Sequence, residues 1–365
     1  MGPIRGETLQ DSGRRDIPSL TGLRGLAALW VVFFHMADNA PIPVIRFGYM
    51  GVDIFFILSG FVLSYVYARK FTIRDFRSYS NFIQARIARI YPLHLVTLFT
   101  LGVIVLCAPE HFMRYPTPEQ RWGIGSFFAS IFLIQNWAHW LPTCWNTPSW
   151  SLSAEFFAYL IFPVFLGVTQ RWQGTKIPLM FAFGSLLLFQ LFMRTKGING
   201  GNVTGTPGML RMVFEFACGC LLYRAISNGL QPLPLVADLV AVGLLLASFL
   251  IEGADFLALP AFAVIVLLAA QDRNLIACCL SVAPIVFLGE ISYSVYLVHW
   301  IILQLWKWLW AGTPLNALDE IAWGGGFLAV VLLVATVTFQ FVEQPARRWG
   351  RRLSLVRAER QAKVS

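Results

Sequence analysis

The chain has 365 residues, of which 57% are hydrophobic and 15% aromatic, while only 13% carry a charge. Because soluble domains carry about 25% charged residues, this composition excludes a set of soluble domains and indicates a polytopic membrane protein. The formal net charge is +9; basic cytoplasmic loops explain it, and no basic helix with interleaved stacking aromatics points to a nucleic-acid partner.

Apolar segments of membrane-spanning length recur along the chain, so we expect an all-α bundle of about ten transmembrane helices. They cover residues 20–38, 50–68, 88–108, 151–168, 177–193, 207–223, 235–251, 257–271, 283–306 and 321–342. A shorter segment, 122–137, would make eleven, but we interpret it as re-entrant or interfacial. The predicted organisation is a cytoplasmic tail over 1–16, one transmembrane domain over 17–345, and a basic cytoplasmic tail over 346–365.

Loop charges predict the orientation of this bundle, because Lys and Arg concentrate in cytoplasmic loops. Ten spans with both termini inside place most basic residues inside, whereas eleven spans would put the basic C-terminal tail outside. Arg194 and Lys196 are the exceptions, since they fall outside. Basic residues predicted inside are Arg69, Lys70, Arg74, Arg77, Arg86, Arg89, Arg171, Lys176, Arg224, Arg273, Arg347, Arg348, Arg351 and Arg352, and acidic residues predicted outside are Glu110, Glu252, Asp255, Asp319 and Glu320.

The first apolar segment carries Arg24 and His35, eleven residues apart. At about 100° per residue, eleven residues make three turns plus about 20°, so both side chains project from one helix face, about 16 Å apart along its axis. Such groups are costly in hydrocarbon and indicate a functional site. An imidazole can take a proton from an alcohol; for His35, a hydrogen bond to a nearby carbonyl is the structural alternative.

The second segment, GYMGVDIFFILSGFVLS, combines small residues with one acid. Gly51, Ser59 and Gly60 allow close approach of a neighbouring helix. Asp53 lies at the predicted outer edge, where Arg46 or a histidine is a candidate partner.

The third segment begins with a pair of arginines, Arg86 and Arg89. A spacing of three residues places both guanidinium groups side by side at the cytoplasmic mouth. Guanidinium groups match phosphate oxygens well, so the pair predicts a phosphate site. Ordinary anchoring of a membrane helix by positive charge is the alternative.

Later segments add further polar groups. Glu155 enters an apolar helix and requires a partner, either as a carboxylate that orients His35 or as an acid favoured by a helix N-terminus. Ser292, Tyr296 and His299 follow one another at spacings of four and three, so they share one face and suit hydrogen bonds to a ligand or to other helices. Glu343 ends the last segment and is predicted to pair with an arginine.

Six elements occur in one order: LTGLRGLAALWVVFFH, GVDIFFILSGF, RIARIYP, WSLSAEFF, SYSVYLVH and EQP. Together they resemble the membrane-bound acyltransferase 3 family, which O-acylates glycans, lipids and antibiotics, and they cover about residues 17–348. The resemblance implies acetyl-coenzyme A (acetyl-CoA) as donor, His35 as the essential histidine, and Arg24, Arg86 and Arg89 as donor-binding residues. Because the sequence shows no SGNH hydrolase-like domain, it is similar to stand-alone members such as xanthan-type exopolysaccharide acetyltransferases of Gram-negative bacteria.

We therefore expect an O-acetyltransferase of the bacterial inner membrane that acts on an exopolysaccharide or its lipid-linked repeat unit. A polysaccharide synthesis or export complex is a candidate partner, and membrane lipid surrounds the bundle. No metal is expected, because the six cysteines lack metal-ligand spacing. The alternative is a transporter or flippase of lipid-linked sugars or of acyl groups, in which the buried charges line a path.

The expected mechanism has the arginines hold the donor phosphates while the thioester reaches His35, about 16 Å deeper and within reach of an extended pantetheine arm. His35 acts as general base on a sugar hydroxyl, and Glu155 or Asp53 fixes its tautomer. An acetyl-His35 intermediate is the rival path. Candidates for contact with substrate or oxyanion are Ser292, Tyr296, His299 and Arg24.

Overall fold

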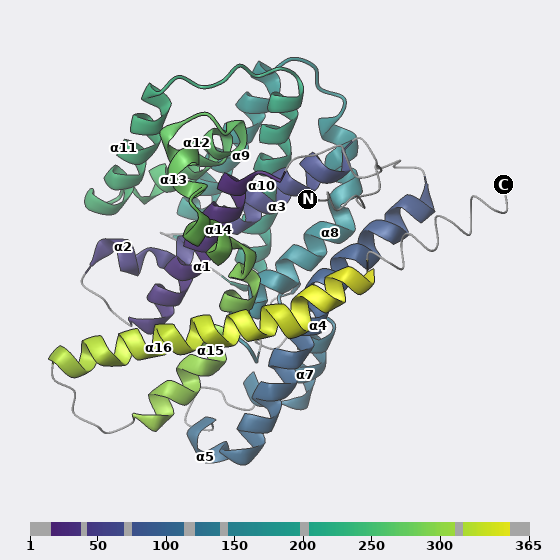
Figure 1. Ribbon diagram of the computed structural model, residues 1–365. Helices are drawn as coiled ribbons and strands as arrows, with labels where there is room; N and C mark the ends of the chain where they lie inside the picture. The colour runs from purple at the N-terminus through teal and green to yellow at the C-terminus, as the bar shows by residue number, and fades with distance from the viewer. Residues whose placement is uncertain are drawn as a thin grey trace, which may run out of the picture.

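The computed structural model describes residues 16–37, 42–68, 75–112, 121–138, 145–197, 204–310 and 317–350, and every regular element in these ranges is helical (Figure 1). The predicted all-α class is thus confirmed. Most of both predicted tails, residues 1–15 and 351–365, lies outside the described residues. The helices are α1 (Pro18–Met36), α2 (Pro43–Arg46), η1 (Gly48–Met50), α3 (Gly51–Tyr67), α4 (Phe76–Cys107), α5 (Pro109–Phe112), α7 (Ile124–Ile131), α8 (Ser149–Thr169), α9 (Lys176–Thr195), α10 (Gly205–Ser227), α11 (Val236–Leu250), η2 (Asp255–Leu257), α12 (Ala258–Gln271), α13 (Leu275–Leu280), α14 (Ala283–Glu290), α15 (Ser292–Leu309), α16 (Ala317–Thr338) and η3 (Phe339–Glu343).

Each of the ten apolar segments coincides with helix, which makes this chain a multi-pass membrane protein. Among the described residues, six helices are long and apolar enough to cross a bilayer, or up to seven if a bent pair forms one span. The helices α11 and α12 are apolar but shorter, and α10 carries Arg211, Glu215 and Arg224 within its 23 residues. The segment 122–137 yields only the eight-residue helix α7, in keeping with its interpretation as re-entrant or interfacial.

The expected ninth span is not one continuous helix. It breaks at Ile291 into α14 and α15, which meet at an angle of 67°. Beside the break, Gly289 packs so closely against the backbone of Thr21 on α1 that a Cβ atom would overlap it. The bend therefore places the start of α15, and with it Ser292, directly against α1.

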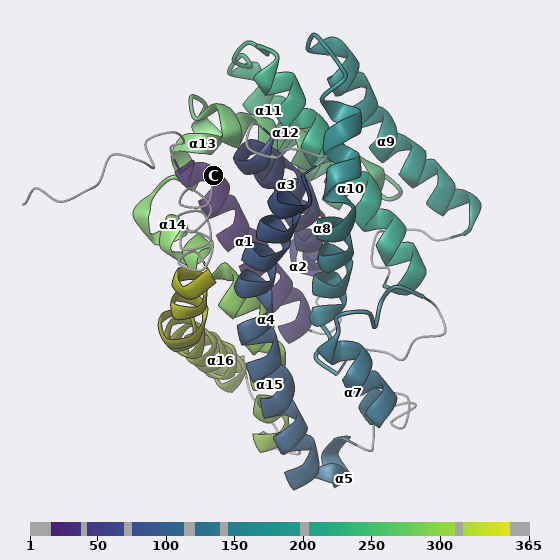
Figure 2. The same cartoon turned by 90° about the vertical axis from the view of Figure 1, so that its right-hand side faces the viewer.

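The helix α1 lies at the centre of the bundle, in contact with α3, α12, α14 and α15 (Figures 1 and 2). One buried core cluster joins α1 and α3 to α9–α12, and a second joins α3 to α4, α8 and α10. In both views α5 and α7 lie at the opposite end of the molecule from α11 and α13. Polar residues on α1 are consequently surrounded by other helices.

Small residues allow close contacts of α3 with its neighbouring helices, as the sequence predicted. A Cβ atom on Gly60 of α3 would overlap the carbonyl oxygen of Phe216 on α10, and one on Gly219 would overlap that of Ile57. Gly51 packs in the same way against the carbonyl oxygen of Ala27 on α1. These contacts let the backbones of α3 and α10 touch, which is how membrane helices gain packing energy without a hydrophobic driving force.

Local signals explain where the functional helices begin. Pro18 opens α1, since a first helical residue needs no N–H donor. Asp75 caps α4 by accepting hydrogen bonds from the backbone N–H groups of Arg77 and Ser78. The cap fixes the start of α4, and therefore the register of Arg86 and Arg89, about three and four turns further along.

Candidate functional site

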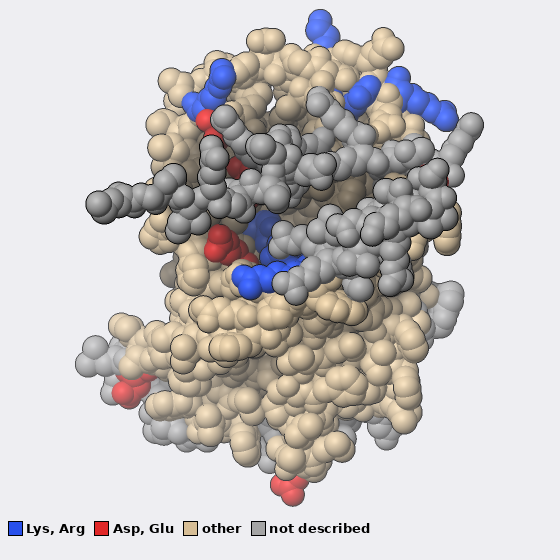
Figure 3. All heavy atoms as spheres, turned by 45° about the vertical axis from the view of Figure 1, so that its right-hand side comes forward, with Lys and Arg blue, Asp and Glu red and all other residues tan. Residues whose placement is uncertain are grey.

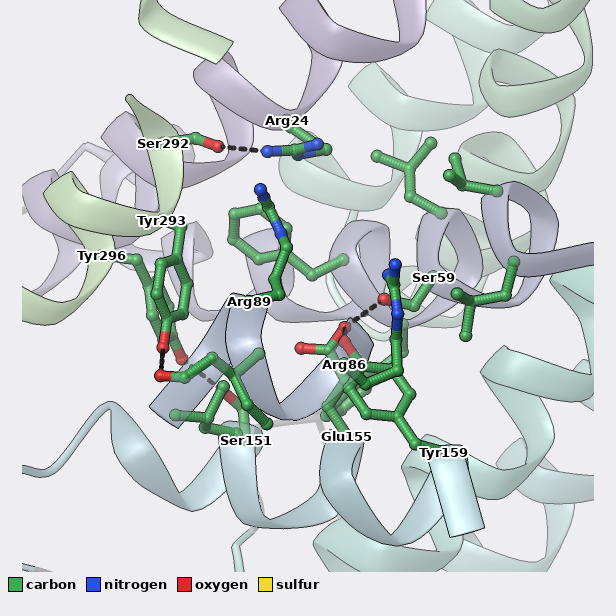
Figure 4. Close-up of a pocket in the computed structure, with 17 residues that line it drawn as sticks. Arg24, Ser59, Arg86, Arg89, Ser151, Glu155, Tyr159, Ser292, Tyr293 and Tyr296 are labelled. Atoms are coloured by element: carbon green, nitrogen blue, oxygen red, sulfur yellow. Dashed lines mark hydrogen bonds between the residues drawn. The ribbon is translucent and has the colours of Figure 1, made fainter. Parts of the chain in front are cut away.

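A pocket with about 840 Å³ of empty space lies where α1, α3, α4, α8 and α15 meet (Figure 4). Three guanidinium groups and one carboxylate line it, so its charge favours an anionic ligand. The structure brings Arg24 together with Arg86 and Arg89, as the sequence predicted. The polar lining consists of Arg24, Ser59, Arg86, Arg89, Ser151, Glu155, Tyr159, Ser292, Tyr293 and Tyr296.

Arg24 is held by neutral acceptors. It donates hydrogen bonds to Ser292 Oγ at 3.2 Å and to the carbonyl oxygen of Gly289 at 3.3 Å. Ser292 Oγ in turn donates to the same carbonyl at 2.7 Å. Within the described part of the chain Arg24 forms no ion pair, so its positive charge can act on a ligand in the pocket.

The two arginines of α4 have different partners. Arg86 donates to the hydroxyl of Tyr67 at 3.2 Å and lies against the rings of Tyr67 and Tyr159; in the described residues it forms no ion pair. Arg89 pairs with Glu343 at 3.1 Å. The predicted pairing of Glu343 with an arginine is thus confirmed, and Arg86 is left as the less neutralised member of the pair.

Glu155 lines the pocket but does not orient His35. Its Oε1 atom accepts hydrogen bonds from Ser59 at 2.5 Å and from Tyr159 at 2.6 Å. The hypothesis that Glu155 fixes the tautomer of His35 is therefore wrong. The reason is tertiary packing: α8 presents Glu155 to α3, on the arginine side of the pocket.

Asp53 is not a partner of His35 either. It accepts a hydrogen bond of 2.6 Å from Arg211 on α10, and Glu215, one helical turn further along, lies 3.5 Å from the same guanidinium nitrogen. All three side chains are buried. Asp53 therefore belongs to a buried cluster of two carboxylates and one guanidinium between α3 and α10, and its predicted pairing with Arg46 or a histidine is wrong.

Two of the three candidates on α15 line the pocket. Ser292 holds Arg24, while the hydroxyl of Tyr296 donates to the carbonyl oxygen of Pro148 at 3.1 Å and shares a 2.7 Å hydrogen bond with Ser151. Both hydroxyls are thus engaged with neighbouring helices. His299 is fully buried and lies outside the pocket lining.

His35 and His299 contact each other instead. The distance from Nε2 of His299 to Nδ1 of His35 is 3.1 Å, and the ring centroids are 5.2 Å apart. Trp300 approaches His35 edge-on at 5.3 Å. Because Arg24 meets the first residue of α15 and His35 meets residues two turns later, α1 and α15 run side by side in the same direction. The prediction that Arg24 and His35 share one face is confirmed.

The pocket and the histidine pair are neighbours. Tyr296 lines the pocket, and its ring centroid lies 6.0 Å from that of His299. The ring of Tyr296 also packs against Phe55, another lining residue. The arrangement places the arginine-lined pocket at one end of the α1–α15 contact and the imidazole of His35 at the other.

Sequence reasoning missed several residues of this region. Arg211 and Glu215 stand four residues apart inside an apolar segment, which is a signal for a paired intramembrane charge that was available in the sequence. Tyr67 and Tyr159 flank Arg86, but tyrosines are common in membrane helices and no spacing distinguished these two. Residues 139–144, before α8, and residues 198–203, before α10, lie outside the described residues.

Comparison with known proteins gives a consistent match. The model of a family described as acyltransferase domain matches residues 17–341. The acyltransferase MdmB of Streptomyces mycarofaciens is 30% identical over 92% of this chain and 93% of its own length. No solved structure matches.

Two further relatives are longer than this chain. The peptidoglycan O-acetyltransferase OatA of Listeria monocytogenes is 25% identical, and the putative peptidoglycan O-acetyltransferase YrhL of Bacillus subtilis is 26% identical. Each match covers 92% of this chain but only 57% and 56% of the relative's length. The similarity to these two proteins thus concerns little more than half of each.

Proposed function

This chain belongs to the acyltransferase 3 family and is a membrane acyltransferase, and on that premise we propose that it moves an acetyl group from acetyl-CoA to a hydroxyl of a glycan. The observation that carries the proposal is the shared geometry of Arg24 and His35. One end of the α1–α15 contact presents three guanidinium groups in a pocket, and the other end presents an imidazole.

The pocket suits the donor because coenzyme A carries several phosphates. Arg24 and Arg86 supply positive charge that no described carboxylate neutralises by an ion pair, and guanidinium groups bind phosphate oxygens in a fork geometry. The largely apolar remainder of the lining, which includes Phe55, Phe56 and Val62, suits the pantetheine arm. The thioester then reaches toward His35 past Tyr296.

His35 acts as the general base in this proposal. It takes the proton of the acceptor hydroxyl while the hydroxyl oxygen attacks the thioester carbonyl. A direct attack on the thioester by His35, which gives an acetyl-histidine, is the rival path. Arg24 lies at the other end of the α1–α15 contact, about 16 Å along α1 from His35, so it binds the donor in this proposal and does not contact the thioester carbonyl.

The proposed acceptor is an exopolysaccharide or its lipid-linked repeat unit. Support comes from the names of the relatives OatA and YrhL, which specify O-acetylation of another glycan, peptidoglycan. The test is the O-acetyl content of the surface polysaccharide, measured by NMR in cells with and without the gene. Loss of O-acetyl signals on deletion supports the proposal, and an unchanged spectrum contradicts it.

We further propose that the protein lies in the bacterial inner membrane with both termini in the cytoplasm. On the face shown in Figure 3, Lys and Arg side chains lie over the upper half and the middle, together with several acidic side chains, whereas the coloured charged side chains at the lower end are acidic. Arg194, an exception to the charge rule, lies 3.5 Å from Asp255 and is thereby partly neutralised. Cysteine labelling of the α10–α11 loop from the cytoplasmic side tests this orientation, and labelling only from the outside contradicts it.

A transporter makes a different prediction for the purified protein. An acetyltransferase in detergent transfers or hydrolyses the acetyl group of radiolabelled acetyl-CoA without any membrane gradient. A transporter or flippase leaves acetyl-CoA intact. Turnover of the label therefore separates the two functions in one measurement.

A further inference from the structure

We propose that His299 is a positioning residue that fixes the tautomer of His35, so that Nε2 of His35 carries the lone pair that accepts the hydroxyl proton. The inference rests on the proposed function, because it takes His35 as the base. It gives His299 a role in place of the substrate contact that the sequence suggested. The role follows from the hydrogen bonds that link His35, His299 and the carbonyl oxygen of Val295.

The first of these hydrogen bonds is made to a backbone carbonyl. Nδ1 of His299 lies 3.1 Å from the carbonyl oxygen of Val295, one turn earlier on α15. A carbonyl oxygen only accepts hydrogen bonds, so Nδ1 of His299 must carry the hydrogen. A neutral imidazole has a single N–H group, which leaves Nε2 of His299 as an acceptor.

The same rule then fixes His35. Nε2 of His299 is 3.1 Å from Nδ1 of His35. Since Nε2 of His299 accepts, Nδ1 of His35 donates, and the lone pair of a neutral His35 resides on its Nε2 atom. The order of donation is therefore His35 to His299 to Val295, and it ends at an atom that cannot donate back.

Burial makes the neutral form of His299 the favoured one. The side chain is completely buried on α15; its ring is stacked on that of His35 and its centroid lies 6.0 Å from that of Tyr296. A second positive charge beside a protonated His35 would meet both desolvation and repulsion. His299 thus serves as a neutral acceptor, in the place that a carboxylate occupies in a catalytic triad.

The acyl transfer balances with this assignment. The acceptor oxygen forms a bond to the thioester carbon while its proton moves to Nε2 of His35. The carbon–sulfur bond then breaks, and the sulfur leaves with the electron pair and takes the proton from Nε2. The products are the acetyl ester and the free thiol of coenzyme A, and His35 returns to its neutral form. While His35 is charged, its Nδ1–H bond to His299 becomes charge-assisted and stronger.

Two variants of His299 separate positioning from packing. In His299→Gln, the amide oxygen accepts from Nδ1 of His35 and the amide nitrogen donates to Val295. In His299→Leu, the apolar side chain fills the space but accepts nothing. We expect His299→Leu to lower kcat by about 100-fold or more while KM for acetyl-CoA changes less than about threefold, and His299→Gln to keep kcat within about tenfold of the wild type.

A structural role would lower activity in both variants through loss of folded protein, which the fluorescence size-exclusion profile measures. Unchanged kcat in a folded His299→Leu variant overturns the proposal. So does an equal loss of kcat in folded His299→Leu and His299→Gln variants.

A spectroscopic test on the wild-type protein needs no activity. The chain contains only five histidines, so ¹⁵N-histidine labelling gives few signals, and those of His35 are the ones lost in His35→Gln. We expect neutral His35 to be protonated on Nδ1 and to become a tautomer mixture in His299→Leu. Protonation on Nε2 in the wild type overturns the proposal. Full acetyl transfer by His35→Gln would instead refute the proposed role of His35 and leave this tautomer result standing.

Discussion

Separate substitutions of Arg86 and Arg89 distinguish donor binding from structural support, because the two residues share a motif but have different partners. Among the described residues Arg86 contacts the hydroxyl and ring of Tyr67 and the ring of Tyr159, whereas Arg89 pairs with the buried carboxylate of Glu343. A hydrogen bond to a charged group contributes about 1.5–3 kcal/mol. Removing Arg86 as Arg86→Gln should therefore raise KM for acetyl-CoA by about 10- to 100-fold, with little change in stability or in use of the acceptor.

Arg89→Gln should behave differently. It leaves Glu343 buried, with Arg347 at 3.4 Å as the other basic group beside it. Breaking a buried ion pair from one side costs about 3–5 kcal/mol, so Arg89→Gln should lower the thermal midpoint in detergent. The double variant with Glu343→Gln removes the stranded charge and should recover much of that loss.

The assay is a titration of radiolabelled acetyl-CoA against purified variants, paired with thermal unfolding in the same detergent. Arg171→Gln, which alters an exposed basic residue of the α8–α9 loop, serves as the control for net charge. An unchanged KM in Arg86→Gln would refute the assignment of the pocket to the donor. An equal loss of stability in Arg86→Gln and Arg89→Gln would refute the distinction between the two arginines.

Three further predictions concern packing and charge. Gly219→Val should lower the thermal midpoint, because a side chain would overlap the backbone of α3 at a cost of about 1–3 kcal/mol. The control is Gly184→Ala, whose added methyl group meets nothing within 4 Å. Equal midpoints for the two variants would contradict the close contact. Arg211→Met should destabilise the protein by about 3–5 kcal/mol, because it leaves two buried carboxylates without their guanidinium partner. Asp53→Asn should cost less, because Glu215 remains beside Arg211. A larger loss of thermal stability in Asp53→Asn than in Arg211→Met would contradict the cluster. Glu155→Gln removes the carboxylate that lines the pocket and should lower KM for acetyl-CoA by about two- to fivefold through reduced repulsion; a raised KM would show that Glu155 assists donor binding.

Local sequence patterns predicted the helices and the shared faces. Hydrophobic length located every long helix, and the eleven-residue spacing placed Arg24 and His35 on the face that contacts α15. The spacing of Arg86 and Arg89 likewise placed both in one pocket. These features depend only on helical periodicity, which the sequence carries directly.

The partners of the carboxylates depend on tertiary contacts that no local pattern contains. Glu155 bonds to Ser59, 96 residues away, and Asp53 bonds to Arg211, 158 residues away. His35 meets His299 across 264 residues. The sequence does not say which helices lie side by side, so it suggested two carboxylates, Glu155 and Asp53, as partners of His35. The structure instead places a second histidine, His299, beside it.

The acetyl-transfer activity of His35→Gln tests directly whether His35 is the general base. We expect purified wild-type protein to release or transfer the label of radiolabelled acetyl-CoA, and His35→Gln to retain acetyl-CoA binding but lose turnover. His94→Gln, which alters a buried histidine bonded to Ser130 on α7, is the matched control and should keep its turnover. Turnover by His35→Gln at the wild-type rate would show that His35 is not the general base.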